Sequence, residues 1–191
     1  MQQLSRLHGV TLVDLMITVS IVSILGIMSF STLPDMLNRY RANTIVESYI
    51  RAVHAAREAA VSRQVLTTVC PQGAATTCGK DWSQGVIVFT DANGNRILDA
   101  GDQVLHSLSP LPGTFRMAWQ SWGNQAYIQF EPAGYTYSHN GTFLLCHMSL
   151  NPNLGRVLIM NKPGRIRKGV DSNGDGVPER ADGSPLECKG W

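Results

Sequence analysis

Catalytic motifs are missing from this sequence. It contains no nucleophile elbow and no glycine-rich phosphate loop, and its five histidines do not form a recognisable set of metal ligands. Hydrolytic and nucleotide-dependent activities therefore have no support. We expect a protein that is not an enzyme and that carries no cofactor, with calcium the one ion considered below.

The sequence also lacks a strong excess of charge of either sign. Lys and Arg number 16 against 14 acidic residues, which gives a formal net charge of +2. Bulk charge therefore does not predict a nucleic-acid or membrane-surface partner, and any electrostatic function must depend on where the charges lie. A chain of 191 residues, 43% of them hydrophobic, is long enough for one domain with an appendage.

Cysteine pairs with zinc-type spacing are absent as well. The four cysteines are Cys70, Cys78, Cys146 and Cys188, and no two of them form a CxxC motif. If the domain that carries them is exported from the cytoplasm, these cysteines are expected to form disulfides. Four cysteines allow three pairings, and proximity in sequence favours Cys70 with Cys78 and Cys146 with Cys188.

One long hydrophobic stretch is present. Residues 10–30 are apolar or small and contain a single charge, Asp14. As a helix this stretch is about 30 Å long, close to the thickness of a bilayer core. No signal-peptidase pattern of small residues follows it. We therefore expect a single-pass membrane anchor that stays in the mature protein.

A short leader precedes this stretch, and the junction resembles the prepilin peptidase site of type IV pilins and pseudopilins. It reads Gly9-Val10-Thr11-Leu12-Val13-Asp14. The resemblance implies that prepilin peptidase cleaves after Gly9, that Val10 becomes a methylated N-terminus, and that Asp14 pairs with the N-terminal amine of a neighbouring subunit. Two residues depart from the family pattern, because Val10 stands for phenylalanine and Asp14 for glutamate. The alternative for Asp14 is a hydrated carboxylate at the interfacial end of the span.

Beyond the hydrophobic stretch, the pattern predicts an amphipathic continuation of the helix, with Pro34 kinking or unwinding it. Apolar residues recur there at steps of three and four: Met36, Leu37, Tyr40, Ile45, Tyr49, Val53, Ala56 and Ala60. After residue 65, short β runs alternate with turn residues, and we expect strands at 66–70, 85–90, 103–108, 115–119, 126–130, 142–147 and 156–160.

Several stretches in this region resemble the GspH/FimT group of minor pilins. They are residues 55–63, Trp82-x-x-Gly85-Val86-Ile87-Val88-Phe89-x-Asp91, Phe130-x-Pro132-x-Gly134, and Gly141-Thr142-Phe143-Leu144-Leu145-Cys146. The resemblance implies an α+β type IV pilin fold, in which a long N-terminal helix packs on an antiparallel β head. The expected organisation is a leader (1–9), a transmembrane and assembly helix (10–34), the amphipathic half of the helix (35–65) and the β-rich head with its tethered tail (66–191).

A basic run follows the last predicted strand. Arg156, Lys162, Arg165, Arg167 and Lys168 occur with no acid among them. Within the run, Gly164-Arg165-Ile166-Arg167 resembles the GRxR motif of FimT-type minor pilins, which bind DNA during natural transformation. In an extended segment the two arginines project to one side, and Pro163 with Gly164 predicts a turn that presents them. The alternative is a solvated edge, since Lys and Arg also protect sheet edges from aggregation.

Two segments resemble calcium loops. The better match has oxygen-bearing positions at Asp171, Asn173, Asp175, Val177, Glu179 and Asp182, with glycine at the sixth position. The weaker match comprises Asp91, Asn93, Asn95, Asp99 and Asp102 and has Arg96 where glycine belongs. Clusters of Asp, Asn and Gly are also the ordinary composition of turns. The aromatic residues Trp82, Trp119, Trp122 and Tyr127 are expected in the core or at its rim rather than as a base-stacking platform.

The function predicted from these features is that of a minor pilin. It would be anchored in the bacterial inner membrane, with its head in the periplasm, and would assemble with major and minor pilins. The basic run adds the hypothesis of non-specific contact with double-stranded DNA. The alternatives are a GspH-like pseudopilin of a type II secretion system and an unrelated single-span periplasmic binding protein.

Overall fold

The computed structural model describes residues 10–189, apart from the side chains of residues 27–32. The predicted leader, including Gly9, lies outside the described residues. The chain divides into two compact units, Met1–Asn38 and Arg39–Trp191. A single helix, α1 (Leu12–Arg63), contributes to both. Pro34 lies inside it without interrupting the helical assignment, so the predicted unwinding does not occur.

The first unit is helical from Leu12 onward, as predicted, and its described apolar side chains are largely exposed. The hydrophobic stretch predicted to anchor the protein ends at Phe30, among the side chains outside the description. Among the described residues, no helix is both long and apolar enough to cross a bilayer.

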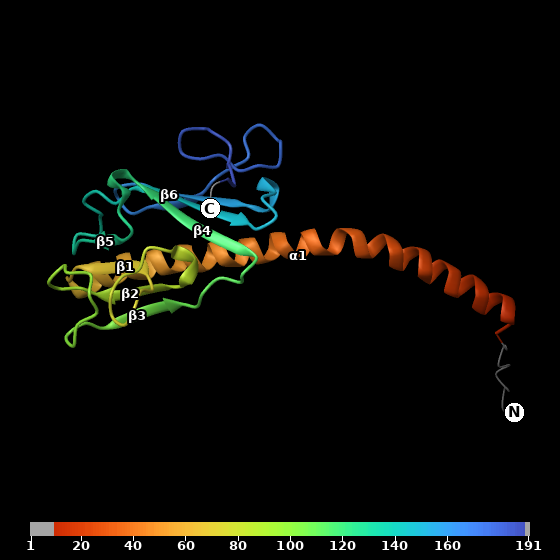
Figure 1. Cartoon of the computed structure of the whole chain (residues 1–191), viewed down its shortest axis with the longest axis horizontal. Helices are drawn as coiled ribbons and strands as arrows, with labels where there is room; N and C mark the ends of the chain where they lie inside the picture. The colour runs from red at the N-terminus through yellow and green to blue at the C-terminus, as the bar shows by residue number, and fades with distance from the viewer. Residues whose placement is uncertain (1–9, 190–191) are drawn as a thin grey trace, which may run out of the picture. The chain divides into compact units, whose positions relative to one another are not determined.

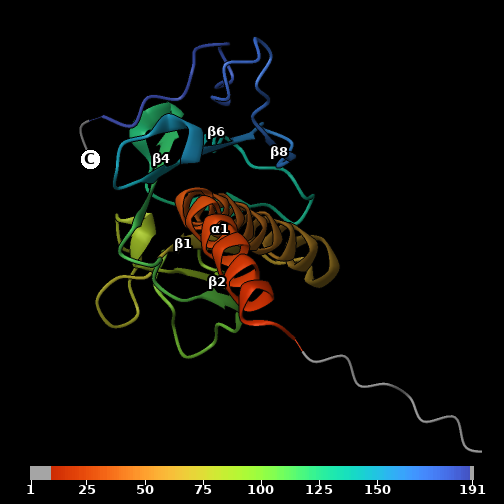
Figure 2. The same ribbon diagram turned by 90° about the vertical axis from the view of Figure 1, so that its right-hand side faces the viewer.

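In the second unit, α1 lies between two antiparallel sheets (Figures 1 and 2). Its buried positions recur at steps of three and four, as two opposed apolar faces require. They are Ala42, Ile45, Val46, Tyr49, Ala52, Val53, Ala56, Ala59 and Ala60. The predicted amphipathic pattern is thus confirmed from Ala42 onward. It is wrong for Met36, Leu37 and Tyr40, all three of which are exposed.

The first sheet has the strand order β3-β2-β1-β5. Its strands are β1 (Thr67–Pro71), β2 (Val86–Thr90), β3 (Val104–Leu108) and β5 (Ile128–Phe130). The second sheet has the order β4-β6-β7-β8. Its strands are β4 (Phe115–Ser121), β6 (Gly141–His147), β7 (Arg156–Met160) and β8 (Ile166–Lys168). All seven predicted strands are present within two residues at either end, whereas β8 was not predicted.

Three short 3-10 helices complete the head: η1 (Trp82–Gln84), η2 (Trp122–Asn124) and η3 (Pro152–Leu154). They join strands through turns rather than extending them. Trp82 of η1 is buried, whereas Trp122 of η2 is 74% exposed.

Phe143 of β6 lies at the centre of an aromatic cluster between the helix and the second sheet. Its ring lies 5.8 Å from that of Tyr49, 4.8 Å from that of Trp82 and 4.4 Å from that of Trp119. The Tyr49 hydroxyl donates to the carbonyl oxygen of Trp82. This hydrogen bond satisfies the polar end of a side chain that is only 2% exposed. Trp82 and Trp119 are therefore core residues, as predicted, whereas the prediction is wrong for the exposed Trp122.

The second sheet is covered on both faces. One face packs on α1, and the other forms a smaller apolar cluster with the C-terminal tail, made of Leu144, Cys146, Val157, Ile159, Leu186 and Cys188. The run from Phe143 to Cys146 is therefore buried at every position rather than at alternate ones. Both predicted disulfides, Cys70–Cys78 and Cys146–Cys188, are present.

The second disulfide closes the longer loop, with a sequence separation of 42 residues against 8 for the first. Loop-closure entropy then predicts that replacing Cys146 and Cys188 by Ser destabilises the head by about 1.5 kcal/mol more than replacing Cys70 and Cys78. Urea unfolding of a head that begins at Arg39 measures both losses of stability. Protease cleavage after residue 170 should rise only in the variant that lacks Cys146 and Cys188. Equal losses would show that chain entropy does not set the contribution of the tail disulfide.

Candidate nucleic-acid interface

The basic run predicted to bind DNA folds as a hairpin of β7 and β8. Its turn is closed by hydrogen bonds from Asn161 N–H to the Arg165 carbonyl at 3.1 Å and from Gly164 N–H to the Asn161 carbonyl at 2.8 Å. The Asn161 side chain also accepts from Arg165 N–H at 2.9 Å. The predicted turn at Pro163 and Gly164 is thus confirmed. We call residues 161–165 the hairpin tip.

Arg165 and Arg167 project from the same side of the chain. Ile166 between them is 8% exposed and belongs to the core beneath α1, whereas both arginines are exposed. Alternation along a strand therefore directs both guanidinium groups away from the helix. Within the described part of the chain, neither guanidinium has a hydrogen-bond or ion-pair partner, so both remain available to an external anion.

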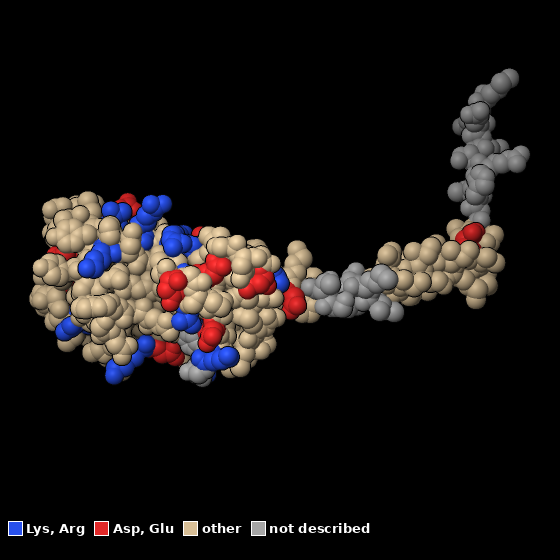
Figure 3. Space-filling view, turned by 90° about the horizontal axis from the view of Figure 1, so that it is seen from above, with Lys and Arg blue, Asp and Glu red and all other residues tan. Residues whose placement is uncertain are grey.

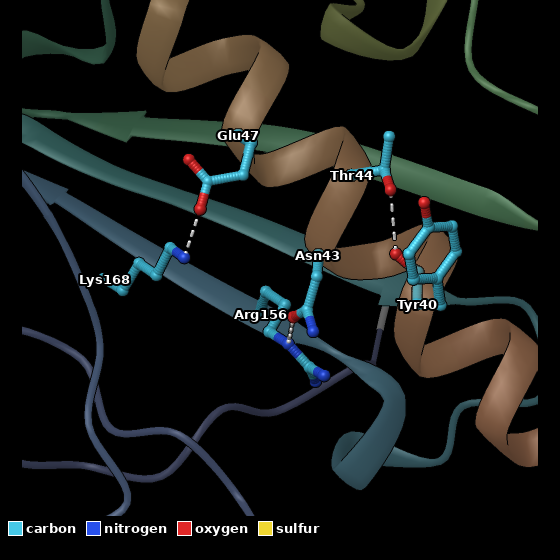
Figure 4. Close-up of polar contacts among 6 residues, drawn as sticks. All are labelled: Tyr40, Asn43, Thr44, Glu47, Arg156 and Lys168. Carbon is cyan, nitrogen blue, oxygen red and sulfur yellow. Dashed lines mark hydrogen bonds and ion pairs between the residues drawn. The ribbon is translucent and has the colours of Figure 1, made fainter.

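Two other basic residues of the run contact α1 instead (Figure 4). Arg156 Nε donates to Asn43 Oδ1 at 2.7 Å and its Nη1 to the Gly155 carbonyl at 2.6 Å. Lys168 forms an ion pair with Glu47. The run is therefore not one free basic patch, and the predicted DNA-binding roles of Arg156 and Lys168 compete with these contacts.

The electrostatics of these two contacts follow from their surroundings. Burial, together with the charge of nearby Arg39, holds the pKa of Arg156 below its usual value. The hydrogen bond and charge of Lys168 lower the pKa of Glu47, which is solvent-exposed. An exposed pair of this kind contributes little to stability. Its structural effect is to join the end of β8 to α1.

Lys162 and Gly164 differ in what they can contribute. The Lys162 side chain is exposed, and its carbonyl oxygen accepts from both Thr136 N–H and Thr136 Oγ1 at 2.9 Å. Gly164 is buried and has a φ of +75°, and a Cβ there would lie 2.4 Å from Phe130 Cε1. Gly164 therefore shapes the tip and is not a contact residue.

Charges of opposite sign separate on the face of the head drawn in Figure 3. Lys and Arg gather mainly toward the upper left of that view, while Asp and Glu lie mainly in the right half of the head. In the C-terminal tail, Asp171, Asp175 and Asp182 are exposed. A polyanion would be repelled by the acidic half of this face and attracted to its basic side.

The predicted calcium loop is held by its own backbone. Asp171 carboxylate oxygens accept from Gly174 N–H at 2.7 Å and Gly176 N–H at 2.8 Å, and Asp175 Oδ1 accepts from Val177 N–H at 2.8 Å. Both Glu179 carboxylate oxygens accept from Ser172 N–H. Over residues 10–189, no three His, Cys, Asp or Glu side chains gather as a metal site. The loop as placed does not present a ligand set, and calcium binding stays a prediction.

The weaker calcium match is a structural turn. Asn93 and Asn95 donate to Asp99 at 3.0 and 2.8 Å. Asp91 is fully buried and accepts from Thr68 at 2.7 Å and from Gln129 at 3.1 Å. This carboxylate therefore joins β1 and β5 to the turn rather than facing solvent.

Asp14, the predicted assembly residue, caps α1 in the single chain. Thr11 donates to Asp14 Oδ2 through its N–H at 3.1 Å and its hydroxyl at 2.7 Å, and Asp14 N–H donates back to Thr11 Oγ1 at 3.2 Å. The reciprocal pair is a capping box, which satisfies donors at the start of the helix. The pairing of Asp14 with a neighbouring subunit stays a prediction.

The close approach of Gly164 to Phe130 yields a stability test. Gly164→Ala should destabilise the head by about 1–3 kcal/mol, because the new methyl group overpacks the ring and φ is positive. Gly174→Ala is the matched control, since Gly174 has a φ of +80° but open space at its Cβ position. Denaturant unfolding should show the larger loss for Gly164→Ala. Equal losses in the two variants would mean that the Phe130 contact contributes nothing.

Comparisons with known proteins agree with this architecture. The profile of the family described as "Type II transport protein GspH" matches residues 46–164. Among solved structures, the type IV minor pilin FimU of Pseudomonas aeruginosa superposes with a TM-score of 0.52 and 20% identity, over 69% of this chain and 90% of FimU. A search of curated proteins finds no significant match.

The minor pseudopilin EpsH from the type II secretion system of Vibrio cholerae superposes equally well. Its TM-score is 0.52 at 9% identity, over 72% of this chain and 99% of EpsH. At such identities the two superpositions establish the fold, whereas the family profile covers more than half of the chain. The chain therefore belongs to the GspH family and is a type IV minor pilin or pseudopilin.

Proposed function

We propose that this protein is a minor subunit of a type IV pilus that assists pilus assembly and binds DNA non-specifically for natural transformation. The observation that carries the DNA proposal is a pair of exposed arginines, Arg165 in the hairpin tip and Arg167 just after it, whose guanidinium groups have no partner among the described residues. Arg165 and Arg167 lie beyond the matched segment, which ends at residue 164, so the family match does not itself supply them.

The spacing of the two arginines suits a nucleic-acid backbone. Residues two apart in a strand lie about 7 Å from one another on the same face, so each guanidinium can bind a different phosphate. Arg forms bidentate hydrogen bonds with phosphate oxygens, and contacts of this kind are independent of base sequence. Lys162 at the hairpin tip adds a third exposed cation.

The competing explanation is edge protection. β8 is the outer strand of its sheet, and basic residues on an edge strand also prevent pairing with another chain. Edge protection requires no affinity for DNA, so a binding measurement separates the two explanations.

The DNA proposal predicts how the protein binds duplex DNA. Binding should be weak, with a Kd of about 10⁻⁴ to 10⁻⁶ M, and should fall steeply with salt. Arg165→Gln with Arg167→Gln should lower the magnitude of the salt slope by roughly two units, because two phosphate contacts are lost. Titrations across several salt concentrations measure this slope.

The matched control is Arg41→Gln with Arg51→Gln, which removes the same charge from exposed positions of α1. It should leave the slope closer to that of the wild type. If both double variants bind as the wild type does, the hairpin is only a protected edge and the DNA proposal fails.

The proposal also includes processing and anchoring of the N-terminus. The junction at Gly9 and Val10 motivates cleavage by prepilin peptidase, and the apolar stretch from Val10 motivates retention in the inner membrane. Disulfides in the head suit the oxidising periplasm. Assembly with other pilins would then use the exposed apolar side chains of the first unit.

Co-expression with a prepilin peptidase should yield a mature protein whose first residue is Val10, as measured by mass spectrometry. A Gly9→Leu variant should keep its leader, because the site resembles one that is cut after glycine. A mature N-terminus beyond residue 30 would mean ordinary secretion and would overturn the anchoring proposal.

A second candidate function is that of a pseudopilin in type II secretion, and the description of the matched family favours it. Deletion of the gene separates the two candidates. Loss of DNA uptake with normal protein export supports the pilus, whereas loss of export with normal DNA uptake supports the secretion system.

A further inference from the structure

Three exposed aromatic residues in the head have no role in its core. Tyr137 is 80% exposed, Trp122 is 74% exposed and Tyr135 is 46% exposed. Single exposed aromatics are common on protein surfaces. Here Tyr135 and Tyr137 lie in one segment, residues 131–140, whose last residue, Asn140, is hydrogen-bonded to Trp122. The same segment is hydrogen-bonded to Lys162 of the hairpin tip.

Hydrogen bonds hold this segment at several points. Glu131 N–H donates to the Tyr135 carbonyl at 3.0 Å, and Thr136 donates twice to the Lys162 carbonyl at 2.9 Å. At its other end, the Asn140 carbonyl accepts from Trp122 N–H at 3.2 Å. The segment therefore connects the hairpin tip to Trp122 through a well-anchored stretch of backbone.

The tyrosines point away from the core on both sides of Thr136. Thr136 is 2% exposed, and its hydroxyl donates to Lys162 and His139 carbonyl oxygens at 2.9 and 3.2 Å. With Thr136 directed inward, its two neighbours face solvent. Fixing the backbone between them means that less conformational entropy is lost when a ligand stacks on the rings.

Cations flank the aromatic segment on both sides. Lys162 and Arg165 lie at the hairpin tip on one side. On the other side, Gln125, which lies three positions after Trp122 in the chain, lines a groove of about 440 Å³. Lys80 and Arg96 line the same groove. Glu131, at the start of the segment, is the one acid in residues 121–140. The positions of Tyr135, Tyr137 and Trp122 therefore have no Asp or Glu next to them in the sequence.

The groove carries an unsatisfied acceptor as well. Gln125 Oε1 is buried and has no hydrogen-bond partner among the described residues. Arg96 lies over the Tyr127 ring at 4.9 Å from its centroid and donates to the Tyr127 hydroxyl at 2.9 Å. A buried acceptor beside a cation suits a ligand that offers both a hydrogen-bond donor and negative charge, as a nucleotide does.

We propose that Tyr135, Tyr137 and Trp122, together with the hairpin tip, form a binding surface for single-stranded DNA. Unpaired bases would stack on the aromatic side chains, and phosphates would bind Lys162 and Arg165. This inference rests on the proposed DNA-binding function and adds its preferred substrate. A duplex hides its base faces, so only a single strand can use both the rings and the cations.

The size of the surface suits a short stretch of DNA. Asn140 lies four positions after Thr136, so the two anchor points are at most about 14 Å apart. Aromatic stacking depends little on base identity, which agrees with the sequence-independent phosphate contacts of the hairpin.

The test uses the full-length chain in detergent, with fluorescein-labelled dT12 and a 12-base-pair duplex as the probes. The wild type should bind dT12 at least tenfold more tightly than the duplex, and binding should quench Trp122 fluorescence. Tyr135→Ala with Tyr137→Ala should weaken dT12 binding by about tenfold or more and leave duplex binding unchanged.

Three further variants control the experiment. Tyr40→Ala removes an equally accessible tyrosine, 71% exposed on α1, and should bind both probes as the wild type does. Tyr135→Phe with Tyr137→Phe keeps the rings and should restore dT12 binding. Arg165→Gln with Arg167→Gln should weaken binding of both probes.

The possible outcomes separate this inference from the proposed function. Duplex binding that depends on Arg165 and Arg167, without preference for dT12 or without loss in the alanine variant, overturns the inference and leaves the proposed function standing. If neither dT12 nor the duplex binds, both the inference and the proposed DNA-binding function are overturned. If the alanine variant binds DNA normally but fails to assemble with other pilins, the tyrosines form a subunit contact and the inference is wrong.

Discussion

The head depends on the burial of one helical segment between two sheets. Residues 39–63 of α1 present small and β-branched side chains to both sides, and neither sheet has another apolar cover on its inner face. Alanines at 42, 52, 56 and 60 let the strands approach the helix closely, while Tyr49 fills the space that Phe143 and Trp82 leave. A larger residue at any of these alanines would have to displace a sheet.

Coverage of the second sheet on its outer face then positions the hairpin. Leu186 and the Cys146–Cys188 disulfide hold the tail against β6 and β7, so these strands are buried on both faces. β7 is thereby fixed, and β8 needs only three residues of pairing to be held in register. Phe130 from the other sheet supports the hairpin tip through its contact with Gly164. The hairpin is thus supported by both sheets.

Strand alternation determines which cations of the hairpin face α1 and which face solvent. Ile166 and Lys168 face α1, so Lys168 meets Glu47, while Arg165 and Arg167 face outward. The same alternation in the segment 135–137 places two tyrosines outward and one threonine inward. The exposed arginines and the exposed tyrosines therefore lie on two segments that are joined by hydrogen bonds from Thr136 to Lys162.

Local patterns in the sequence were sufficient for much of this protein. Periodicity predicted the helix and seven strands, proximity predicted both disulfide pairs, and the junction and head motifs indicated the pilin family. These features depend on residues close together in the chain, or on spacings that one element imposes. Pro34 lies inside α1 without ending it. Met36, Leu37 and Tyr40 are exposed, so the buried pattern begins only at Ala42.

Only the tertiary structure decided which residues of the basic run are free. Arg156 and Lys168 meet partners 113 and 121 residues earlier in the chain, and no local pattern reports such contacts. β8 was missed because three residues are too few to show a period, and its pairing with β7 defines it. The segment of the exposed tyrosines is joined to the hairpin tip through the bond between Thr136 and Lys162, which lie 26 residues apart. Sequence therefore determined the elements and the family, whereas long-range packing decided which charges and rings reach solvent together.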